Sequence, residues 1–520
     1  MKIWTSTGFL TFLLWLNLAA AEDLFKSYFL SCDGKIVSIH AEDLDADGMK
    51  DLALFYIDKD KNHRKFALYF QLENGFPEYP NQVFTLPVDL ALLDFGDISE
   101  SPGLELIYFG RGGIFYHTLS DSGYASAPQK FKDISSIFMY PDNSKIQLWN
   151  FVTDLNSDGR ADIFIPQFSG TTILLGQKNF ARWQENKLDL RPQSRQFSYY
   201  NPRFSVGAKA GAVYSAPYLL RKDFNADNHD DIIAIYKDSL KTYLQQTDGS
   251  FSHRADHSIP LAHGDIWNGA KIMRTHLDDQ NERQFFMRLL DIDGDSLLDI
   301  VSASISTKNS LINPETKTSL FLGKKTAQGT YFFAENPDFI IKPNGTQMVI
   351  DIFDFNNDGR QDFLIPTIKI GVTSIIKMLL TRSVDFEAQL FLMQAKNGFT
   401  LEAQQKIDIT VRFSFRGGAA SPIYEIADFN NDGYKDILTS ADEEKLLLYW
   451  GDRKHVINPK SKGTYRIVLP QDGTLVQATD LNADNRADVI IQYEDNKLKW
   501  MGKSNGLHVL LRNEFSGDQK

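Results

Sequence analysis

The nonapeptide Asp428-Phe429-Asn430-Asn431-Asp432-Gly433-Tyr434-Lys435-Asp436 contains the pattern that decides the fold of this chain. Oxygen-bearing side chains occupy its positions 1, 3, 5 and 9, and the glycine at position 6 tolerates the positive φ that a tight loop often needs. The apolar pair Ile437-Leu438 follows directly and is typical of a strand. The sequence therefore predicts a compact loop of oxygen ligands that leads into a β-strand.

The same pattern recurs along the chain. Complete copies begin at Asp43, Asp154, Asp223, Asp291, Asp354 and Asp480. A degenerate copy begins at Asp94, with Gly96 at position 3 and Pro102 at position 9, and we expect no ion there. The mean spacing is about 62 residues, which suits a four-stranded propeller blade with generous loops.

Apolar segments flank the repeated loops. Leu52-Ala53-Leu54-Phe55 follows the first loop, and Val489-Ile490-Ile491 follows the last. A third segment often ends near glycine, as in the run from Leu446 to Gly451. No stretch shows a sustained period of 3.6 residues with helix caps, so the sequence predicts an all-β protein.

The two ends of the chain predict how the repeats close. Residues 1–21 have the features of a signal peptide, namely Lys2, an apolar run over residues 9–18 and a small-residue cleavage site at Ala19-Ala20-Ala21. The mature segment before the first loop and the tail after the last together amount to about one repeat. We therefore expect one domain over residues 22–520, an eight-bladed β-propeller of four-stranded blades closed by both termini. In it, the segment Leu24–Leu30 pairs into the blade that holds the Asp480 loop, and seven blades is the alternative.

The loop residues have the chemistry of a calcium site. Ca²⁺ takes six to eight oxygen ligands, and no His or Cys occupies a ligand position, which disfavours Zn²⁺ and Cu²⁺. Isolated Asx-rich turns are common, but turn chemistry does not require an acid at position 9 of seven copies. The Asp291 loop departs most from the pattern, because Ser296 is at position 6 and Gly294 lies earlier. We predict up to seven Ca²⁺ ions, with the ligands Asp43, Asp45, Asp47, Asp51, Asp154, Asn156, Asp158, Asp162, Asp223, Asn225, Asp227, Asp231, Asp291, Asp293, Asp295, Asp299, Asp354, Asn356, Asp358, Asp362, Asp428, Asn430, Asp432, Asp436, Asp480, Asn482, Asp484 and Asp488.

The D-x-(D/N)-x-D-G-x-x-D loop followed by a short hydrophobic strand resembles the FG-GAP/VCBS repeat of integrin-α-type β-propellers. The resemblance covers essentially the whole mature chain. It implies that each loop joins two strands of one blade and that a calcium ion stiffens the hairpin. Members of this family include adhesion modules, lectins and noncatalytic parts of enzymes, while some related calcium-dependent propellers are polysaccharide lyases.

One insertion does not follow the repeat pattern. Residues 177–209 carry a net charge of +5 within an acidic chain, and aromatic residues are interleaved with the basic ones. Arg side chains bind carboxylates and aromatic faces stack on sugars or bases, so this insertion is a candidate contact for an acidic glycan or another anionic partner. The alternative is that it packs on a neighbouring blade and pairs with acids there. The candidate ligand-binding residues are Arg182, Trp183, Arg191, Arg195, Tyr199, Tyr200 and Arg203.

Composition narrows the class of function. The net charge of −12 argues against nonspecific nucleic-acid binding, and the single cysteine, Cys32, excludes an internal disulfide. No run after the signal segment is long and apolar enough to span a bilayer, and no common catalytic motif occurs. We expect a secreted or periplasmic calcium-binding propeller that serves as an adhesion, binding or scaffold module for a protein or glycan partner, without catalysis of its own. The alternative is a calcium-dependent polysaccharide lyase or another carbohydrate-active enzyme on this scaffold.

Overall fold

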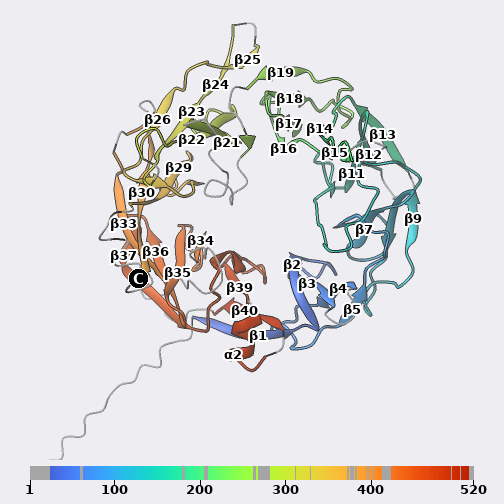
Figure 1. Cartoon of the computed structure of the whole chain (residues 1–520), viewed down its shortest axis with the longest axis horizontal. Coiled ribbons are helices and arrows are strands. Elements are labelled where there is room, and N and C mark those ends of the chain that lie inside the picture. The colour runs from blue at the N-terminus through green and yellow to red at the C-terminus, as the bar shows by residue number, and fades with distance from the viewer. Residues whose placement is uncertain are drawn as a thin grey trace, which may run out of the picture.

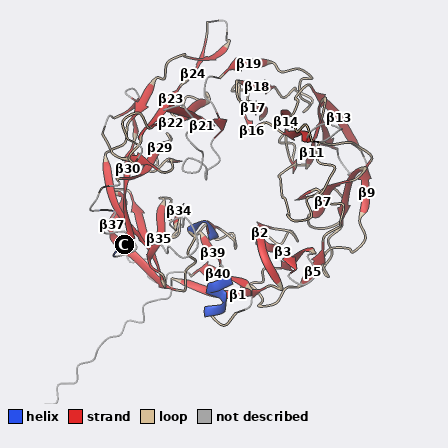
Figure 2. Cartoon of the chain, in the orientation of Figure 1, coloured by secondary structure: helices blue, strands red, loops and turns tan. Residues whose placement is uncertain are grey.

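The computed structural model describes residues 24–58, 63–177, 182–203, 209–261, 265–266, 282–310, 312–327, 329–369, 371, 374, 380, 383–394, 398–400, 402–412, 423–493, 495–503 and 505–513. In this part of the chain, eight principal β-sheets stand side by side around a ring (Figure 1). Strands make up nearly all of the regular structure, and the helices lie in the last blade (Figure 2). The expected signal peptide, residues 1–21, falls outside the described residues.

The first four blades each contain four antiparallel strands. In chain order the strands are β2 (Gly34–Glu42), β3 (Asp51–Asp58), β4 (Arg64–Tyr69) and β5 (Gln82–Thr85); β6 (Leu92–Gly96), β7 (Glu105–Gly110), β8 (Gly113–His117) and β9 (Gln129–Lys132); β10 (Val152–Thr153), β11 (Asp162–Gln167), β12 (Gly170–Gly176) and β13 (Trp183–Leu188); and β16 (Tyr218–Lys222), β17 (Asp231–Ile235), β18 (Ser239–Tyr243) and β19 (His257–Pro260).

Blades five and six each have an additional short strand, and blade eight uses both ends of the chain. Their strands are β20 (Asp265–Ile266), β21 (Glu282–Leu290), β22 (Asp299–Ser306), β23 (Glu315–Phe321) and β26 (Phe339–Ile341); β27 (Thr346–Gln347), β28 (Asp351–Phe353), β29 (Asp362–Ile368), β30 (Ser383–Phe391) and β33 (Gln405–Arg412); β34 (Tyr424–Ala427), β35 (Asp436–Asp442), β36 (Lys445–Asp452) and β37 (Val456–Arg466); and β38 (Val476–Thr479), β39 (Asp488–Gln492), β40 (Gly506–Arg512) and β1 (Phe25–Ser31).

A few elements lie outside this blade pattern. Three two-stranded sheets are formed by β14 (Gln193–Tyr199) with β15 (Lys209–Ser215), β24 (Gly323–Lys325) with β25 (Tyr331–Phe333), and β31 (Met393–Gln394) with β32 (Gly398–Phe399). The short helices are η1 (Gly473–Leu475) and α2 (Asp495–Trp500). Among the described residues, no helix has both the length and the apolar character needed to cross a membrane.

The N-terminal strand closes the ring. Strand β1 pairs antiparallel with β40, so that Phe25 lies opposite Arg512 and Ser31 lies opposite Gly506. The buried Arg512 guanidinium reinforces this joint, because its Nη1 donates to the carbonyl of Leu24 at 2.6 Å and its Nε donates to the carbonyl of Phe429 at 2.9 Å. The prediction of eight blades closed by both termini is confirmed, and the seven-bladed alternative is wrong.

The hydrophobic core is divided among the junctions between blades. Eight clusters of buried side chains occur in the described residues, one between each pair of neighbouring sheets. Successive side chains of a strand point to opposite faces, so Leu52 and Leu54 of β3 pack toward blade eight while Ala53 and Phe55 pack toward blade two. Because both faces of such a strand are buried, its sequence is a continuous apolar run. The result is a scaffold whose two open faces carry the connecting loops.

Candidate functional site

Each of the seven predicted loops connects two consecutive antiparallel strands of one blade, and the loops share one hydrogen-bond pattern. In each loop the carboxylate at position 1 accepts the backbone N–H of position 6, as Asp43 does from Gly48 at 3.0 Å. The side-chain oxygen at position 3 accepts the N–H of position 5, and the carboxylate at position 5 accepts the N–H of position 7. In all seven loops the predicted ligand side chains at positions 1, 3 and 5 are therefore bonded to the backbone of their own loop.

The backbone turns left-handed at two positions of each loop. Position 6 has positive φ in all seven, including Asn228 at 67° and Asn485 at 63°. Position 4 also has positive φ in all seven loops. The residues at this position include Ala46 at 64° and Ala483 at 57°, although alanine is not a residue that predicts a left-handed turn. In the Asp291 loop, Gly294 at position 4 has φ 80° and Ser296 at position 6 has φ 69°. That loop therefore has the conformation of the others, and its glycine simply occupies the other left-handed position.

The aspartate at position 9 has a role that the sequence analysis missed. Asp51 is fully buried, and its two oxygens accept the N–H groups of Leu44 at 3.0 Å and Gln71 at 2.8 Å. The equivalent aspartates of the other loops, Asp162, Asp231, Asp299, Asp362, Asp436 and Asp488, make the same two bonds. Each therefore ties its loop to the end of the second strand after the loop, or to the residues that directly follow that strand. A lone pair on each oxygen is still available for a cation.

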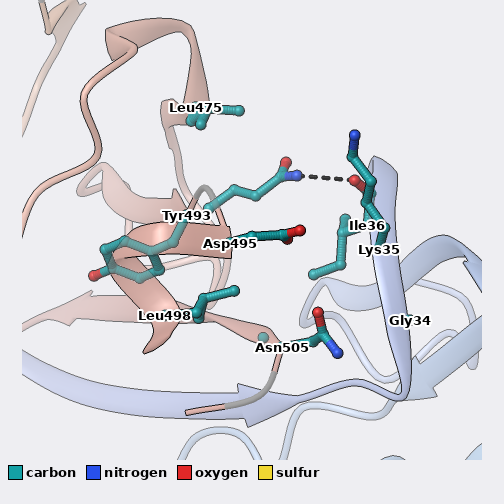
Figure 3. Close-up of a pocket in the computed structure, with 10 residues that line it drawn as sticks. Gly34, Lys35, Ile36, Leu475, Tyr493, Asp495, Leu498 and Asn505 are labelled. Atoms are coloured by element: carbon teal, nitrogen blue, oxygen red, sulfur yellow. Dashed lines mark hydrogen bonds between the residues drawn. The ribbon is translucent and has the colours of Figure 1, made fainter. Parts of the chain in front are cut away.

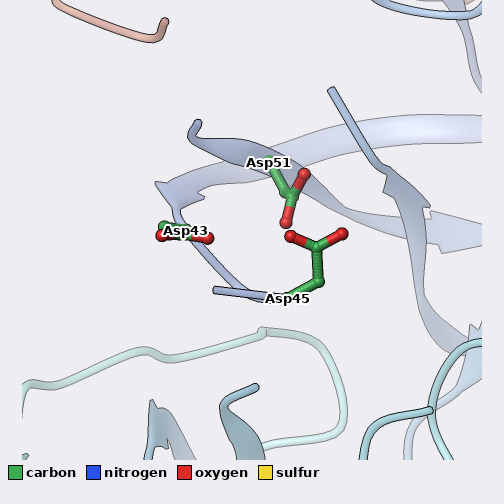
Figure 4. A group of neighbouring side chains, drawn as sticks. All are labelled: Asp43, Asp45 and Asp51. Carbon is green, nitrogen blue, oxygen red and sulfur yellow. The ribbon is translucent and has the colours of Figure 1, made fainter. Parts of the chain in front are cut away.

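Three carboxylates converge in two of the loops. Asp43, Asp45 and Asp51 each place one oxygen within 4.8 Å of the others (Figure 4), and Asp291, Asp293 and Asp299 do the same. Burial raises the pKa of Asp51 to about 7, and the charge of Asp45 adds to this effect. Burial likewise raises the pKa of Asp299 to about 7, with a contribution from Asp293. Among the described residues, these two loops are the places where three acidic side chains come this close together.

The remaining five loops are less acidic at the same positions. Their position 3 is asparagine, whose amide nitrogen donates to the carboxylate at position 5, as Asn225 does to Asp227 at 2.8 Å. In four of them a basic residue at position 7 also contacts that carboxylate, for example Arg160 on Asp158 at 2.8 Å. Met49 and Leu297 occupy position 7 of the two densest loops and bring no charge.

The donor set fits a hard divalent cation such as calcium. The side chains at positions 1, 3, 5 and 9 are all carboxylates or amides, whose oxygens are ligands that Ca²⁺ prefers. In the Asp480 loop, Oδ1 of Asp480 is buried and has no hydrogen-bond partner among the described residues. A buried carboxylate oxygen without a donor is costly, and a cation at the centre of the loop would satisfy it.

The degenerate copy begins at Asp97, and the sequence-based start at Asp94 was wrong. Glu105 is at position 9 of this loop, and its Oε2 accepts the N–H of Ile98 at position 2, at 2.9 Å. The position-9 aspartates of the other loops accept the N–H of position 2 in the same way. Its position 6 is Pro102, whose ring fixes φ at a negative value, so this loop cannot form the left-handed turn of the other seven.

Asp94 instead lies in β6 and links two blades. Its buried carboxylate accepts the N–H groups of Phe151 and Val152 of blade three, both at 2.7 Å, and the N–H of Phe95 at 3.0 Å. The error arose because Asp94 and Asp97 are both spaced plausibly from the first loop. Only the end of β6 at Gly96 shows which of them starts the turn.

All the loops emerge on one face of the ring, which we call the loop face. Neighbouring loops there are bonded directly: the N–H of Lys50 donates to the carbonyl of Leu481 at 2.7 Å, and the N–H of Ala487 donates to the carbonyl of Asp428 at 2.8 Å. The side-chain amide of Asn357 adds a bond to the carbonyl of Gly433 at 3.1 Å. These contacts link successive loops across blade boundaries.

The basic insertion is divided by the structure into two parts. Arg182 and Trp183 belong to the outer edge of blade three, where Trp183 packs against Phe131 with ring centroids 5.1 Å apart. Arg195 and Tyr199 lie on the hairpin of β14 and β15, which we call the basic ribbon, and Tyr200 follows directly. Arg191 precedes the ribbon and Arg203 follows β14, and both are exposed. The seven candidate residues therefore do not form one site.

The ribbon lies on the face opposite the loop face. It leaves blade three after β13, next to the turn between β11 and β12. There Phe168 packs against Tyr214 of the ribbon, with the ring centroids 4.9 Å apart. In Figure 1 the ribbon lies inward of β13. Within the described residues, no ion pair involves Arg191, Arg195 or Arg203. The expected alternative, in which these arginines pair with carboxylates of a neighbouring blade, is therefore not observed there.

A cavity of about 460 Å³ lies at the seam where blade eight meets blade one (Figure 3). Lys35 and Ile36 line it from β2, and Gln492, Asp495 and Asn505 line it from blade eight. Gln492 crosses the seam and donates to the carbonyl of Ile36 at 3.1 Å. This cavity could not be predicted from the sequence, because its walls come from opposite ends of the chain and meet only through ring closure.

Comparisons with known proteins agree with this architecture. A family model described as an FG-GAP-like repeat matches residues 291–365 and 389–491. Together with the eight-bladed ring, these repeat matches support assignment of the chain to an FG-GAP β-propeller family. A search of curated proteins found no match to this chain.

Solved structures similar to this chain include an Agrocybe aegerita lectin described as recognising non-reducing terminal N-acetylglucosamine. It is 13% identical, with a TM-score of 0.39, over 93% of this chain and 96% of the lectin. The V. cholerae biofilm matrix protein Bap1 is 11% identical, with a TM-score of 0.29, over 95% of this chain and 92% of Bap1. The Dos1 propeller is 11% identical, with a TM-score of 0.37, over 95% of this chain and 96% of that one.

Proposed function

We propose that this chain is an exported calcium-binding β-propeller that acts as a binding or scaffold module for a protein or glycan partner. The observation that carries the proposal is the recurrence of one loop conformation in seven blades, with three carboxylates converging in two of these loops. When bound, calcium would supply the positive charge that these carboxylates lack and would hold each hairpin in place. The aspartates at positions 1 and 5 would hold the ion together with the position-3 side chain, which is aspartate in two loops and asparagine in five, and with the position-9 carboxylate behind them.

Calcium titration of the purified mature chain tests this proposal. Each occupied loop stabilises the folded state by about 1.4–2.7 kcal/mol when free calcium is about 10–100 times Kd. We expect a large increase in melting temperature between EDTA and calcium, and several equivalents of bound calcium by isothermal titration calorimetry. Magnesium is the matched control, because it retains its waters and fits such loops less well. A melting temperature that does not change with calcium would contradict the proposal.

The absence of catalysis is also part of the proposal and has its own assay. Uronate polymers incubated with the protein and calcium should keep their length, and no unsaturated product should absorb in the ultraviolet. Depolymerisation would instead establish the carbohydrate-active alternative.

A further inference from the structure

We propose that one face of the basic ribbon binds an acidic, uronate-bearing polysaccharide. The proposal deepens the binding role suggested above and rests on it. It concerns the face that carries Arg195, Phe197 and Tyr199 of β14 with Lys209 and Val213 of β15.

The register of the ribbon determines which side chains share a face. Residues directly opposite in an antiparallel pair project to the same side, and Arg195 pairs with Val213 while Tyr199 pairs with Lys209. The other side carries small or neutral residues and Tyr214, which packs against Phe168 of blade three. The ribbon is therefore anchored by one face, and the basic and aromatic face is turned away from that contact.

The aromatic side chains of this face are exposed in an arrangement suited to stacking. Phe197 is 46% exposed and Tyr199 is 63% exposed. The ring of Phe197 lies over Gly211, where an added Cβ would come within 2.5 Å of Cζ. Because the glycine leaves room beneath it, the ring lies across the ribbon and presents a face to solvent. The apolar C–H side of a sugar ring can stack on such a face.

The charge around this face selects an anionic ligand. From Leu190 to Lys222 the chain contains six arginines and lysines and no aspartate or glutamate, whereas the protein as a whole has a net charge of −12. Arg195 and Lys209 are exposed, and neither forms an ion pair with another described residue. Their charges are available to the carboxylates of a ligand, and an arginine can bind a carboxylate through two parallel hydrogen bonds.

The same features favour a polysaccharide over other polyanions. A nucleic acid carries dense charge along its whole length and would be repelled by the acidic remainder of the protein beyond this ribbon. A protein partner usually places its main anchors in well-packed pockets, whereas this face is a flat two-stranded surface. A uronate polymer offers sparse carboxylates and apolar ring faces in alternation, which match the alternation of cations and rings here.

The test measures binding of hyaluronan and galacturonate oligosaccharides to the calcium-loaded full chain by calorimetry or thermophoresis. Neutral cello-oligosaccharides, polyglutamate and single-stranded oligothymidine are the comparison ligands. We expect binding of at least one uronate ligand that weakens as salt is raised, and no comparable binding of the other three. Failure of both uronate ligands, or equal binding of polyglutamate or oligothymidine, would overturn the proposal.

Variants assign the binding to this face. The double substitution R195S/K209S should weaken binding at least tenfold and flatten its salt dependence. F197S should weaken binding with the salt dependence retained, and G211V, which displaces the ring without removing any charge, should act in the same direction. The control R254S/K342S removes the same two charges from exposed positions outside the ribbon and should leave binding unchanged. Equal losses in the ribbon and control variants would refute the assignment.

The calcium response of the same samples separates this proposal from the function on which it rests. All ribbon variants should keep the calcium-dependent rise in melting temperature of the unmodified chain, because the loops lie on the opposite face. A normal calcium response without uronate binding overturns the ribbon proposal alone. Loss of the calcium response in the unmodified chain contradicts the calcium-binding function itself.

Discussion

Asp51 and Asp45 belong to the same loop, yet replacing each with alanine should have different consequences. Asp51 is fully buried and accepts the N–H groups of Leu44 and Gln71, so D51A leaves two buried donors without a partner. Each unsatisfied group costs about 1–3 kcal/mol, which gives about 2–6 kcal/mol of lost stability whether or not calcium is present. The position-9 aspartate is therefore expected to be structural first and a ligand second.

Asp45 is exposed, and within its loop it accepts one long hydrogen bond, from the N–H of Asp47 at 3.3 Å. In EDTA, D45A should therefore change stability by no more than about 0.5 kcal/mol. At free calcium of about 100 times Kd it should cost about 2.7 kcal/mol, the linkage energy of one lost site. The contrast between the two variants lies in how each depends on calcium.

Denaturant unfolding of both variants and the unmodified chain, in EDTA and in calcium, measures the contrast directly. E105A provides the matched control, since Glu105 makes the equivalent bond to Ile98 in the loop that we expect to hold no ion. It should destabilise the protein equally in both buffers. The reasoning is refuted if D51A matches the unmodified chain in EDTA, or if D45A is as destabilising in EDTA as it is in calcium.

Three further predictions follow from the loops and the ring closure. Calorimetry should assign the tightest calcium sites to the two loops with three converging carboxylates, so that D45N/D293N removes the high-affinity phase; retention of that phase would contradict the ranking. In EDTA, D94A should cost at least about 2 kcal/mol more than D97A, because two N–H groups of blade three lose their acceptor; equal denaturant midpoints would contradict this role. Deletion of residues 22–31 should expose the edge of β40, and light scattering should detect association, whereas a stable monomer would show that β1 is dispensable.

Much of the fold could be predicted because the repeat is local. The acid ladder marks the first connection of each blade, and the apolar runs around it mark the strands. The length of chain outside the loops predicted that β1 would complete blade eight, and Phe25–Ser31 does so. Such features depend on spacing along the chain, which the sequence displays directly.

Other features depend on contacts that spacing does not encode. Alanine at position 46 has positive φ because the loop's hydrogen bonds require it, and alanine itself gives no signal of this. The start of the degenerate loop depends on where β6 ends. The separation of Trp183 from Arg195 depends on β13 continuing as the outer strand of blade three before the ribbon begins. In each case the feature is decided by a contact between residues that are distant in sequence, or by hydrogen bonds of the backbone.

The two faces of the ring are suited to different tasks. On the loop face the side chains of each loop are bonded to its own backbone, and neighbouring loops are bonded to one another, as Asn357 is to Gly433. A partner that bound there would have to compete with these bonds and with any bound ion. On the opposite face the basic ribbon follows blade three, and within the described residues its exposed basic side chains form no ion pair with the blades. Calcium should therefore influence ligand binding at the ribbon only through the stiffness of the ring. Chelation of calcium should weaken ligand binding gradually as the blades loosen. The R195S/K209S substitution should weaken ligand binding while the ring stays intact.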